Sequence, residues 1–119
     1  MLSPERIERL RGYLLEQQAT LKQQLVGLAD AAQETNVGLG NHMAEDATAA
    51  FDQAATLSLR RGHERALKEV ESALARIDGQ HYGRCERCEA EIDFARLKAV
   101  PHAIHCMKCQ RLAELHTFA

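Results

Sequence analysis

Four cysteines carry the clearest chemical signal in this chain of 119 residues. They form two Cys-x-x-Cys pairs separated by seventeen residues, at Cys85, Cys88, Cys106 and Cys109. Each pair places two sulfurs on the same side of a tight turn, and two such turns supply four thiolates to a tetrahedral Zn²⁺ at about 2.3 Å. Four thiolates leave no coordination position open for water. We therefore expect one structural zinc ion and no hydrolytic chemistry.

Two other interpretations of the cysteines stay open. A redox Cys-x-x-Cys pair normally lies at the start of a helix in a βαβ unit, a context that is missing from this sequence. An iron–sulfur cluster also uses four thiolates, and the cysteines alone do not exclude iron. His105 adjoins Cys106, but with four cysteines available we expect no histidine ligand.

The segment that holds the cysteines, residues 80–119, has few large apolar side chains. Such a small unit needs a bound metal or another cross-link because it buries too little apolar surface to be stable by itself. We therefore expect metal binding to supply folding free energy, and chelation to unfold this segment.

The part of the chain before the cysteines predicts two long helices. Ser3 followed by Pro4 is typical of a helix start. Apolar residues then recur every seven positions, which indicates a coiled-coil seam, at Ile7, Leu14, Leu21 and Leu28. Glycines and asparagines in residues 36–41 predict a turn. A second helix is expected from near Met43 to about Asp78.

The second helix has its own apolar positions, which are Ala47, Ala50, Phe51, Ala54, Leu57, Leu67, Val70, Leu74 and Ile77. Two helices joined by a short turn must run antiparallel. We therefore predict a mainly α protein with two domains. Residues 1–79 form a long antiparallel helical hairpin, a coiled coil with its tip near residues 36–46. Residues 80–119 form a small four-cysteine zinc-finger module with a C-terminal helix.

Charge and hydropathy exclude several classes of protein. The formal net charge is −2, which disfavours binding to nucleic acid through phosphate neutralisation. The sequence has no apolar run long enough for a membrane span, and the first residues become charged at once, unlike a signal peptide. We expect a cytoplasmic protein, where thiols stay reduced. The sequence shows neither a nucleophile–base set nor a phosphate-binding glycine loop, so we do not expect an enzyme.

The residues around the cysteines resemble the zinc-finger signature of the bacterial DksA/TraR family, over about 30 residues. The matching segments are 81–88, 91–92, 96–101 and 106–109. The resemblance implies a transcription regulator that binds RNA polymerase directly and does not bind specific DNA sequences. It also implies that the hairpin enters the secondary channel of the polymerase and that the tip approaches the active centre. The zinc ion would be structural.

The resemblance carries over to particular residues at the tip. An ungapped count back from Cys85 puts His42 and Glu45 where the family has two aspartates, and Ala47 matches the alanine that follows them. With the adjacent Asp46, these residues are the expected partner-binding tip. A simpler role for Glu45 and Asp46 is a favourable interaction with the helix dipole. Arg96 is expected either to pack across the zinc module or to contact a partner.

The sequence also departs from the family. Glu69, Val100 and Gln110 stand where better-known members have basic residues that contact guanosine tetraphosphate. Because a phosphate-rich ligand needs Lys or Arg, we expect weak or no response to this nucleotide. Glu89 replaces a glycine after the second cysteine. It must therefore take a positive φ, at a cost of about 1 kcal/mol, or the turn must differ.

Two rival functions remain. A zinc ribbon that binds nucleic acid would need a basic face and would lose affinity steeply with salt. A coiled-coil adaptor would hold another protein without acting on polymerase. A mixed-charge stretch in residues 60–71 fits a solvated helix face with i,i+4 ion pairs. Contact with polymerase is the alternative for its cations, Arg60, Arg61, Arg65 and Lys68.

Overall fold

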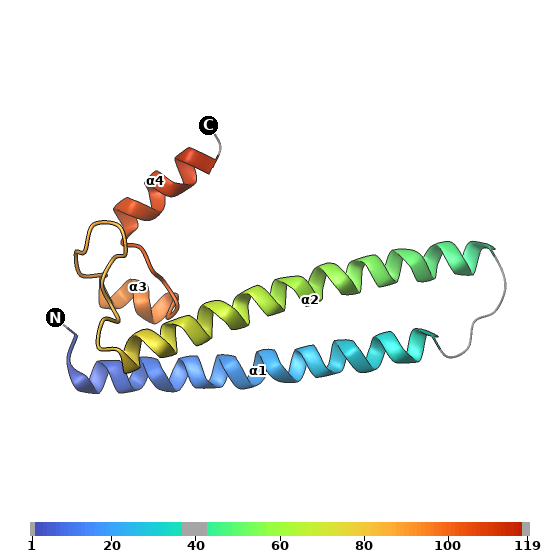
Figure 1. Cartoon of the computed structure of the whole chain (residues 1–119), viewed down its shortest axis with the longest axis horizontal. Helices are drawn as coiled ribbons and strands as arrows, with labels where there is room; N and C mark the ends of the chain where they lie inside the picture. The colour runs from blue at the N-terminus through green and yellow to red at the C-terminus, as the bar shows by residue number, and fades with distance from the viewer. Residues whose placement is uncertain (1, 37–42, 118–119) are drawn as a thin grey trace. The chain divides into compact units, whose positions relative to one another are not determined.

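The computed structural model describes the backbone of residues 2–36 and 43–117, and the side chains of residues 2–29 and 47–115. Four helices follow one another along this part of the chain (Figure 1). They are α1 (Pro4–Asn36), α2 (Met43–Asp78), α3 (Phe94–Ala99) and α4 (Met107–Thr117). The mainly α fold with two long helices and a C-terminal helix is confirmed. The turn expected between the long helices lies outside the described residues. None of the helices described has the length and apolar character to cross a membrane.

The start of α1 has the predicted cap. The backbone N–H of Arg6 donates to Ser3 Oγ at 3.3 Å, and the N–H of Ile7 donates to the Ser3 carbonyl at 3.0 Å. The bond to Ser3 Oγ satisfies a first-turn donor that has no backbone partner, and the bond to the Ser3 carbonyl is the first backbone bond of the helix. Pro4 begins the helix without loss because its missing N–H would be unpaired there.

The chain forms two compact units, and each long helix contributes to both. Unit 1 consists of Met1–Gln17 and Glu69–Ala119, and unit 2 consists of Gln18–Lys68. The predicted division into residues 1–79 and 80–119 separates the chain by sequence alone and stays a prediction.

Unit 1 contains every buried side chain of the described part of the molecule. Its apolar core draws on α1, on the end of α2 and on the cysteine segment. The members are Leu10, Leu14, Val70, Ala73, Ile77, Tyr82, Cys85, Ile92, Leu97, Ala103 and Cys109. Residues of the long helices thus supply the apolar surface that the cysteine segment lacks.

Unit 2 pairs the second part of α1 antiparallel with the first part of α2 (Figure 1). The predicted seam residues Leu21 and Leu28 of α1 are half-buried, as are Ala49, Thr56 and His63 of α2. Five of the apolar positions predicted for the second helix are exposed, namely Ala47, Ala50, Phe51, Ala54 and Leu57. Phe51 is 74% exposed and Leu57 is 46% exposed, so the prediction that these positions are buried is wrong. The reason is register: each helical residue rotates by about 100°, so Phe51 is turned far from the Ala49 position.

Candidate metal centre

The four cysteines meet in unit 1, although they come from two segments of the chain. Their Sγ atoms all lie within 4.8 Å of one another, and those of Cys88 and Cys106 are 3.7 Å apart. Tetrahedral Zn²⁺ with bonds of about 2.3 Å separates its sulfurs by about 3.8 Å. A disulfide would need about 2.05 Å. The four sulfurs therefore fit one zinc ion and not a pair of disulfides.

The first cysteine pair lies in a tight turn closed by backbone hydrogen bonds. Cys85 N–H donates to the Ala90 carbonyl at 2.8 Å, and Glu89 N–H donates to the Cys85 carbonyl at 2.9 Å. Arg84 and Glu91 form an antiparallel bridge at the base of the turn. Glu89 adopts φ 62°. Of the two outcomes expected for this residue, the chain therefore takes the strained one and keeps the turn.

The second cysteine pair is built on the start of α4. Cys106 precedes the helix, Cys109 lies in its first turn, and Gln110 N–H donates to the Cys106 carbonyl at 2.9 Å. A hydrogen bond from the Cys109 backbone N–H lowers the pKa of the Cys106 thiol. A helix start favours a thiolate because its free N–H groups point towards the sulfur.

The environment of the other sulfurs also bears on metal binding. Burial opposes ionisation of Cys85, but backbone donors, chiefly that of Cys106, lower its pKa to about 6. Burial raises the pKa of Cys109 to about 12, and the neighbouring Cys85 sulfur adds to the rise. Four sulfurs at this separation cannot all be anionic without a compensating charge. A divalent cation supplies that charge and releases the remaining protons.

Arg96 joins α3 to the second cysteine pair. Its Nε donates to the His105 carbonyl at 2.9 Å, and its Nη1 lies 3.1 Å from Met107 Sδ. The arginine therefore holds the residues on either side of Cys106. Leu97, the next residue of α3, is fully buried and anchors α3 in the apolar core of unit 1.

The Tyr-Gly pair before Cys85 has two separate structural tasks. The Tyr82 hydroxyl donates to the Pro101 carbonyl at 2.6 Å, which ties the two halves of the cysteine segment together. Gly83 has φ 87°, and a Cβ on it would lie 2.6 Å from Leu2 Cδ1. Glycine is therefore required both by the backbone conformation and by the close approach of the Leu2 side chain.

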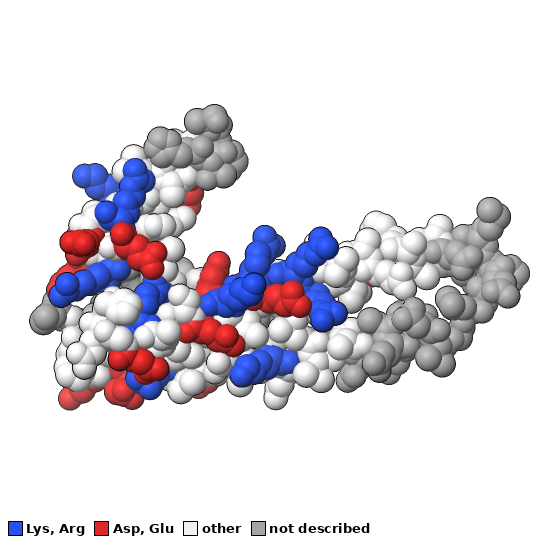
Figure 2. Space-filling model, viewed as in Figure 1, with Lys and Arg blue, Asp and Glu red and all other residues white. Residues whose placement is uncertain are grey.

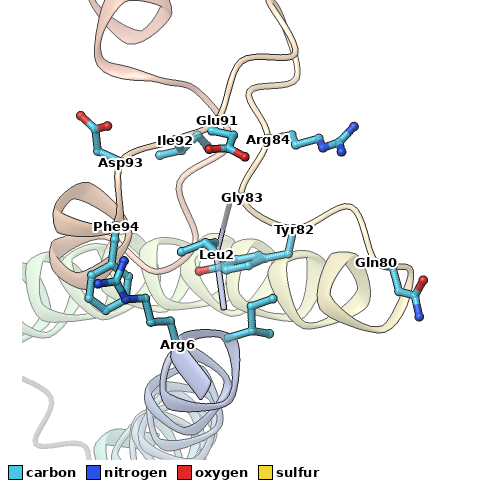
Figure 3. A pocket seen from close by; sticks show the side chains of 11 residues that line it. Leu2, Arg6, Gln80, Tyr82, Gly83, Arg84, Glu91, Ile92, Asp93 and Phe94 are labelled. Carbon is cyan, nitrogen blue, oxygen red and sulfur yellow. The ribbon is translucent and has the colours of Figure 1, made fainter. Parts of the chain in front are cut away.

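Leu2 and Gly83 lie at a pocket of about 350 Å³ in unit 1, shown in Figure 3. The guanidinium carbon of Arg6 lies 4.6 Å from the centre of the Phe94 ring, so a cation–π contact joins α1 to the start of α3. The first turn of α1 thus packs directly on the zinc module.

Arg76 and His102 have structural roles that sequence reasoning missed. Arg76 of α2 is buried and donates from Nη2 to the His102 carbonyl at 3.3 Å. His102 Nε2 in turn lies 3.3 Å from Glu69 Oε2. The sequence pattern could have indicated this role. Arg76 lies between the apolar positions Ala73 and Ile77 of α2, and a charged side chain that is buried there needs polar partners.

The predicted tip residues fall near or outside the limit of the described chain. His42 lies outside the described residues. Glu45 and Asp46 belong to the first turn of α2, and Ala47 is exposed in the next turn. The structure thus places Glu45, Asp46 and Ala47 at the start of α2.

The family profile described as "Prokaryotic dksA/traR C4-type zinc finger" matches residues 81–115, which include all four cysteines. General stress protein 16O of Bacillus subtilis is 30% identical over 112 residues, which cover 92% of this chain and 69% of that protein. The RNA polymerase-binding transcription factor DksA of Escherichia coli is 41% identical over 69 residues, which cover 56% of this chain and 46% of that protein. The match thus spans about half the length of DksA.

The fold is that of transcription factor DksA2 from Pseudomonas aeruginosa, with a TM-score of 0.89 at 20% identity over 98% of this chain and 89% of that one. The C4-type finger and the spacing of the sulfurs together assign one zinc ion to the four-cysteine cluster. The extent of the similarity to General stress protein 16O and the zinc-finger match show that the chain belongs to the DksA/TraR family.

Proposed function

We propose that this protein is a transcription regulator that binds RNA polymerase and modulates initiation. The observation that carries the proposal is the agreement between the similarity in sequence and the similarity in fold. The sequence resembles a protein named as an RNA polymerase-binding transcription factor, and the fold matches DksA2 over nearly the whole chain. The chain would act in the cytoplasm by binding, and not as an enzyme.

In the proposed mode of action, the helical hairpin inserts into the secondary channel of the polymerase. Unit 1 contains all the buried side chains described and the zinc centre, which suits a firm base at the channel entrance. Each of the two long helices contributes residues to both units. In this mode the tip residues would act near the active centre.

A pull-down with core RNA polymerase tests this mode directly. We expect the full chain to be retained, and a second protein that occupies the secondary channel to displace it. Retention without displacement would place the contact elsewhere. Loss of retention altogether would leave a coiled-coil adaptor as the better description.

The tip is tested separately with Glu45→Ala/Asp46→Ala. The double variant should retain binding to core polymerase but lose its effect in a purified transcription assay. Asp52→Ala removes an exposed acid further along α2 and serves as the matched control. Activity of the double variant equal to that of the wild type would exclude the tip mechanism.

We propose that Cys85, Cys88, Cys106 and Cys109 are the ligands of the zinc ion. Purified protein should contain one zinc per chain, and Cys88→Ser should lower that content because three thiolates hold the ion less tightly. His105→Ala should retain the full zinc content. Zinc loss from this control would make the neighbouring histidine a ligand.

Guanosine tetraphosphate should bind weakly or not at all. Glu69 stands at a position where better-known family members carry a cation, and its carboxylate already faces His102 at 3.3 Å. A second negative charge approaching this carboxylate is repelled, whereas a phosphate needs Lys or Arg. Titration of the protein, alone and with polymerase, measures the affinity. Micromolar binding would overturn this expectation.

A further inference from the structure

One face of α2 in unit 2 is left without a partner in the described molecule. Its residues recur at spacings of three and four, which places them on the same side of a helix. The face begins with apolar side chains and continues with cations. We call it the α2 outer face, and it consists of Phe51, Ala54, Leu57, Ser58, Arg61, Arg65 and Lys68, all of which are exposed.

The apolar half of the α2 outer face includes two large side chains that are exposed to solvent. Phe51 is 74% exposed and Leu57 is 46% exposed, while the seam of unit 2 runs along a different side of the helix. Ala54, Leu57 and Ser58 line an open groove of about 630 Å³, and Arg61, Arg65 and Lys68 continue it. Small residues beside exposed large ones leave room for a side chain of another protein.

The cationic half of the face carries three cations without a salt-bridge partner among the described residues. Glu64 also lines the groove, but its carboxylate is paired with Arg60 Nε at 3.1 Å. Among the residues that the structure describes, none forms an ion pair with Arg61, Arg65 or Lys68. Figure 2 shows basic side chains gathered along this stretch of α2, with acidic side chains among them, next to a mostly white stretch.

We propose that the α2 outer face is the docking surface for an acidic amphipathic helix of RNA polymerase. This inference rests on the proposed function and specifies the chemistry of the contact. The face extends over residues 51–68, a length of about 26 Å at 1.5 Å per residue, which accommodates several turns of a partner helix. An apolar side chain of that helix fills the groove at Leu57, and its carboxylates pair with Arg61, Arg65 and Lys68.

A protein helix fits this face better than a nucleic acid does. A phosphate backbone would pair with the three cations but would leave Phe51 and Leu57 exposed to water. The net charge of −2 also opposes the long-range attraction on which nucleic-acid binding depends. An amphipathic helix satisfies both halves of the face at once.

The test measures the affinity of the full chain for core RNA polymerase from the same organism. Arg65→Glu/Lys68→Glu should weaken binding at least tenfold because each acid would face an acid of the partner. Phe51→Ser should weaken it several-fold through loss of the apolar contact. The matched controls lie on α1 within the same unit: Lys22→Glu reverses an exposed cation, and Val26→Ser removes an apolar side chain that is 63% exposed.

The outcomes separate this inference from the function on which it rests. If the wild type binds polymerase and the face variants bind equally well, the inference is overturned while the proposed function stands. If the wild type does not bind, both are wrong. Equal losses in the face variants and the controls would also overturn the inference. So would tight, salt-sensitive binding of the wild type to a DNA duplex that the charge reversal abolishes.

All four variants change exposed side chains, so folding should be unaffected. Far-ultraviolet circular dichroism and thermal melting check this for each protein before binding is measured. Increasing salt should weaken wild-type binding to polymerase and should have much less effect on Arg65→Glu/Lys68→Glu, because the reversed face no longer contributes attraction.

Discussion

Nη1 of Arg76 lies 3.6 Å from Oε1 of Glu86, so a buried arginine of α2 contacts the residue that follows the first zinc-site cysteine. The same guanidinium donates to the His102 carbonyl, four residues before the third cysteine. Glu86 N–H in turn donates to the Ile104 carbonyl at 2.9 Å. One side chain of the long helix therefore holds both segments that supply sulfur to the metal centre.

Replacement of this side chain should destabilise the zinc module. Arg76→Met retains an apolar stem but removes both contacts, and we expect the free energy of unfolding to fall by about 1–3 kcal/mol because the His102 carbonyl loses its donor. Arg11→Met removes the exposed Arg11–Asp78 pair of 2.9 Å and should cost less than about 1 kcal/mol. Denaturant unfolding measures both. Equal effects would show that burial of Arg76 has no special importance.

Removal of zinc should unfold the cysteine segment and spare part of the hairpin. The segment has few large apolar side chains, so metal binding supplies much of its folding free energy. After chelation we expect amides of α3 and α4 to exchange with solvent far faster, and the helical circular dichroism signal to fall only in part. Unchanged exchange and melting after complete metal removal would contradict a structural role for zinc.

Replacement of Glu89 by glycine should stabilise the protein. Glu89 has φ 62°, and an L residue in this region is strained by about 1–2 kcal/mol in the folded state. Glycine removes this strain, although its greater entropy in the unfolded chain costs about 0.5–1 kcal/mol. The strain is the larger of the two free energies. Glu89→Gly should therefore raise the free energy of unfolding by up to about 1 kcal/mol. Ala90→Gly, at the next position, has no positive φ to relieve and should lower it. A destabilised Glu89→Gly would mean that the glutamate makes a compensating contact.

Gly83 should tolerate no side chain. Alanine would adopt a positive φ at a cost of about 1–2 kcal/mol, and its Cβ would lie 2.6 Å from Leu2 Cδ1. The double variant Gly83→Ala/Leu2→Ala removes the collision but not the backbone strain. We therefore expect it to recover part of the loss, relative to the sum of the single variants. Strict additivity of the two changes would show that Leu2 does not pack on this glycine.

The contribution of Tyr82 to the free energy of unfolding should be lost at alkaline pH. Burial raises the pKa of Tyr82 from 10.0 to about 12, although the positive charge of Arg76 lowers it somewhat. The folded state thus keeps a proton that the unfolded state releases. The contribution is complete below pH 10 and is lost as the pH rises from 10 to 12.

Tyr82→Phe provides the matched comparison. It removes the hydrogen bond to Pro101 and should cost about 1–3 kcal/mol at neutral pH. The difference in unfolding free energy between the wild type and the variant should shrink between pH 10 and 12, since only the wild type can ionise at this position. A difference independent of pH across this range would contradict the burial of the hydroxyl.

Local sequence patterns were enough to predict the metal centre and the long helices of this protein. The cysteine spacing predicted the metal centre because each turn is set by four consecutive residues. The seven-residue apolar repeat and the Ser3–Pro4 cap predicted α1, since helix formation depends on neighbours three or four residues apart. The positive φ of Glu89 was one of two outcomes expected because the family has a glycine at this position.

Only the tertiary structure decided which surfaces of these elements meet. Phe51 and Ala49 are both apolar residues near the start of α2, but the register between the long helices half-buries Ala49 and exposes Phe51. The hydrogen bond from Arg76 to the His102 carbonyl joins residues 26 positions apart, and no local pattern contains that information. Helices and metal turns arise from short-range interactions, whereas the choice of the face that is buried depends on how distant segments pack.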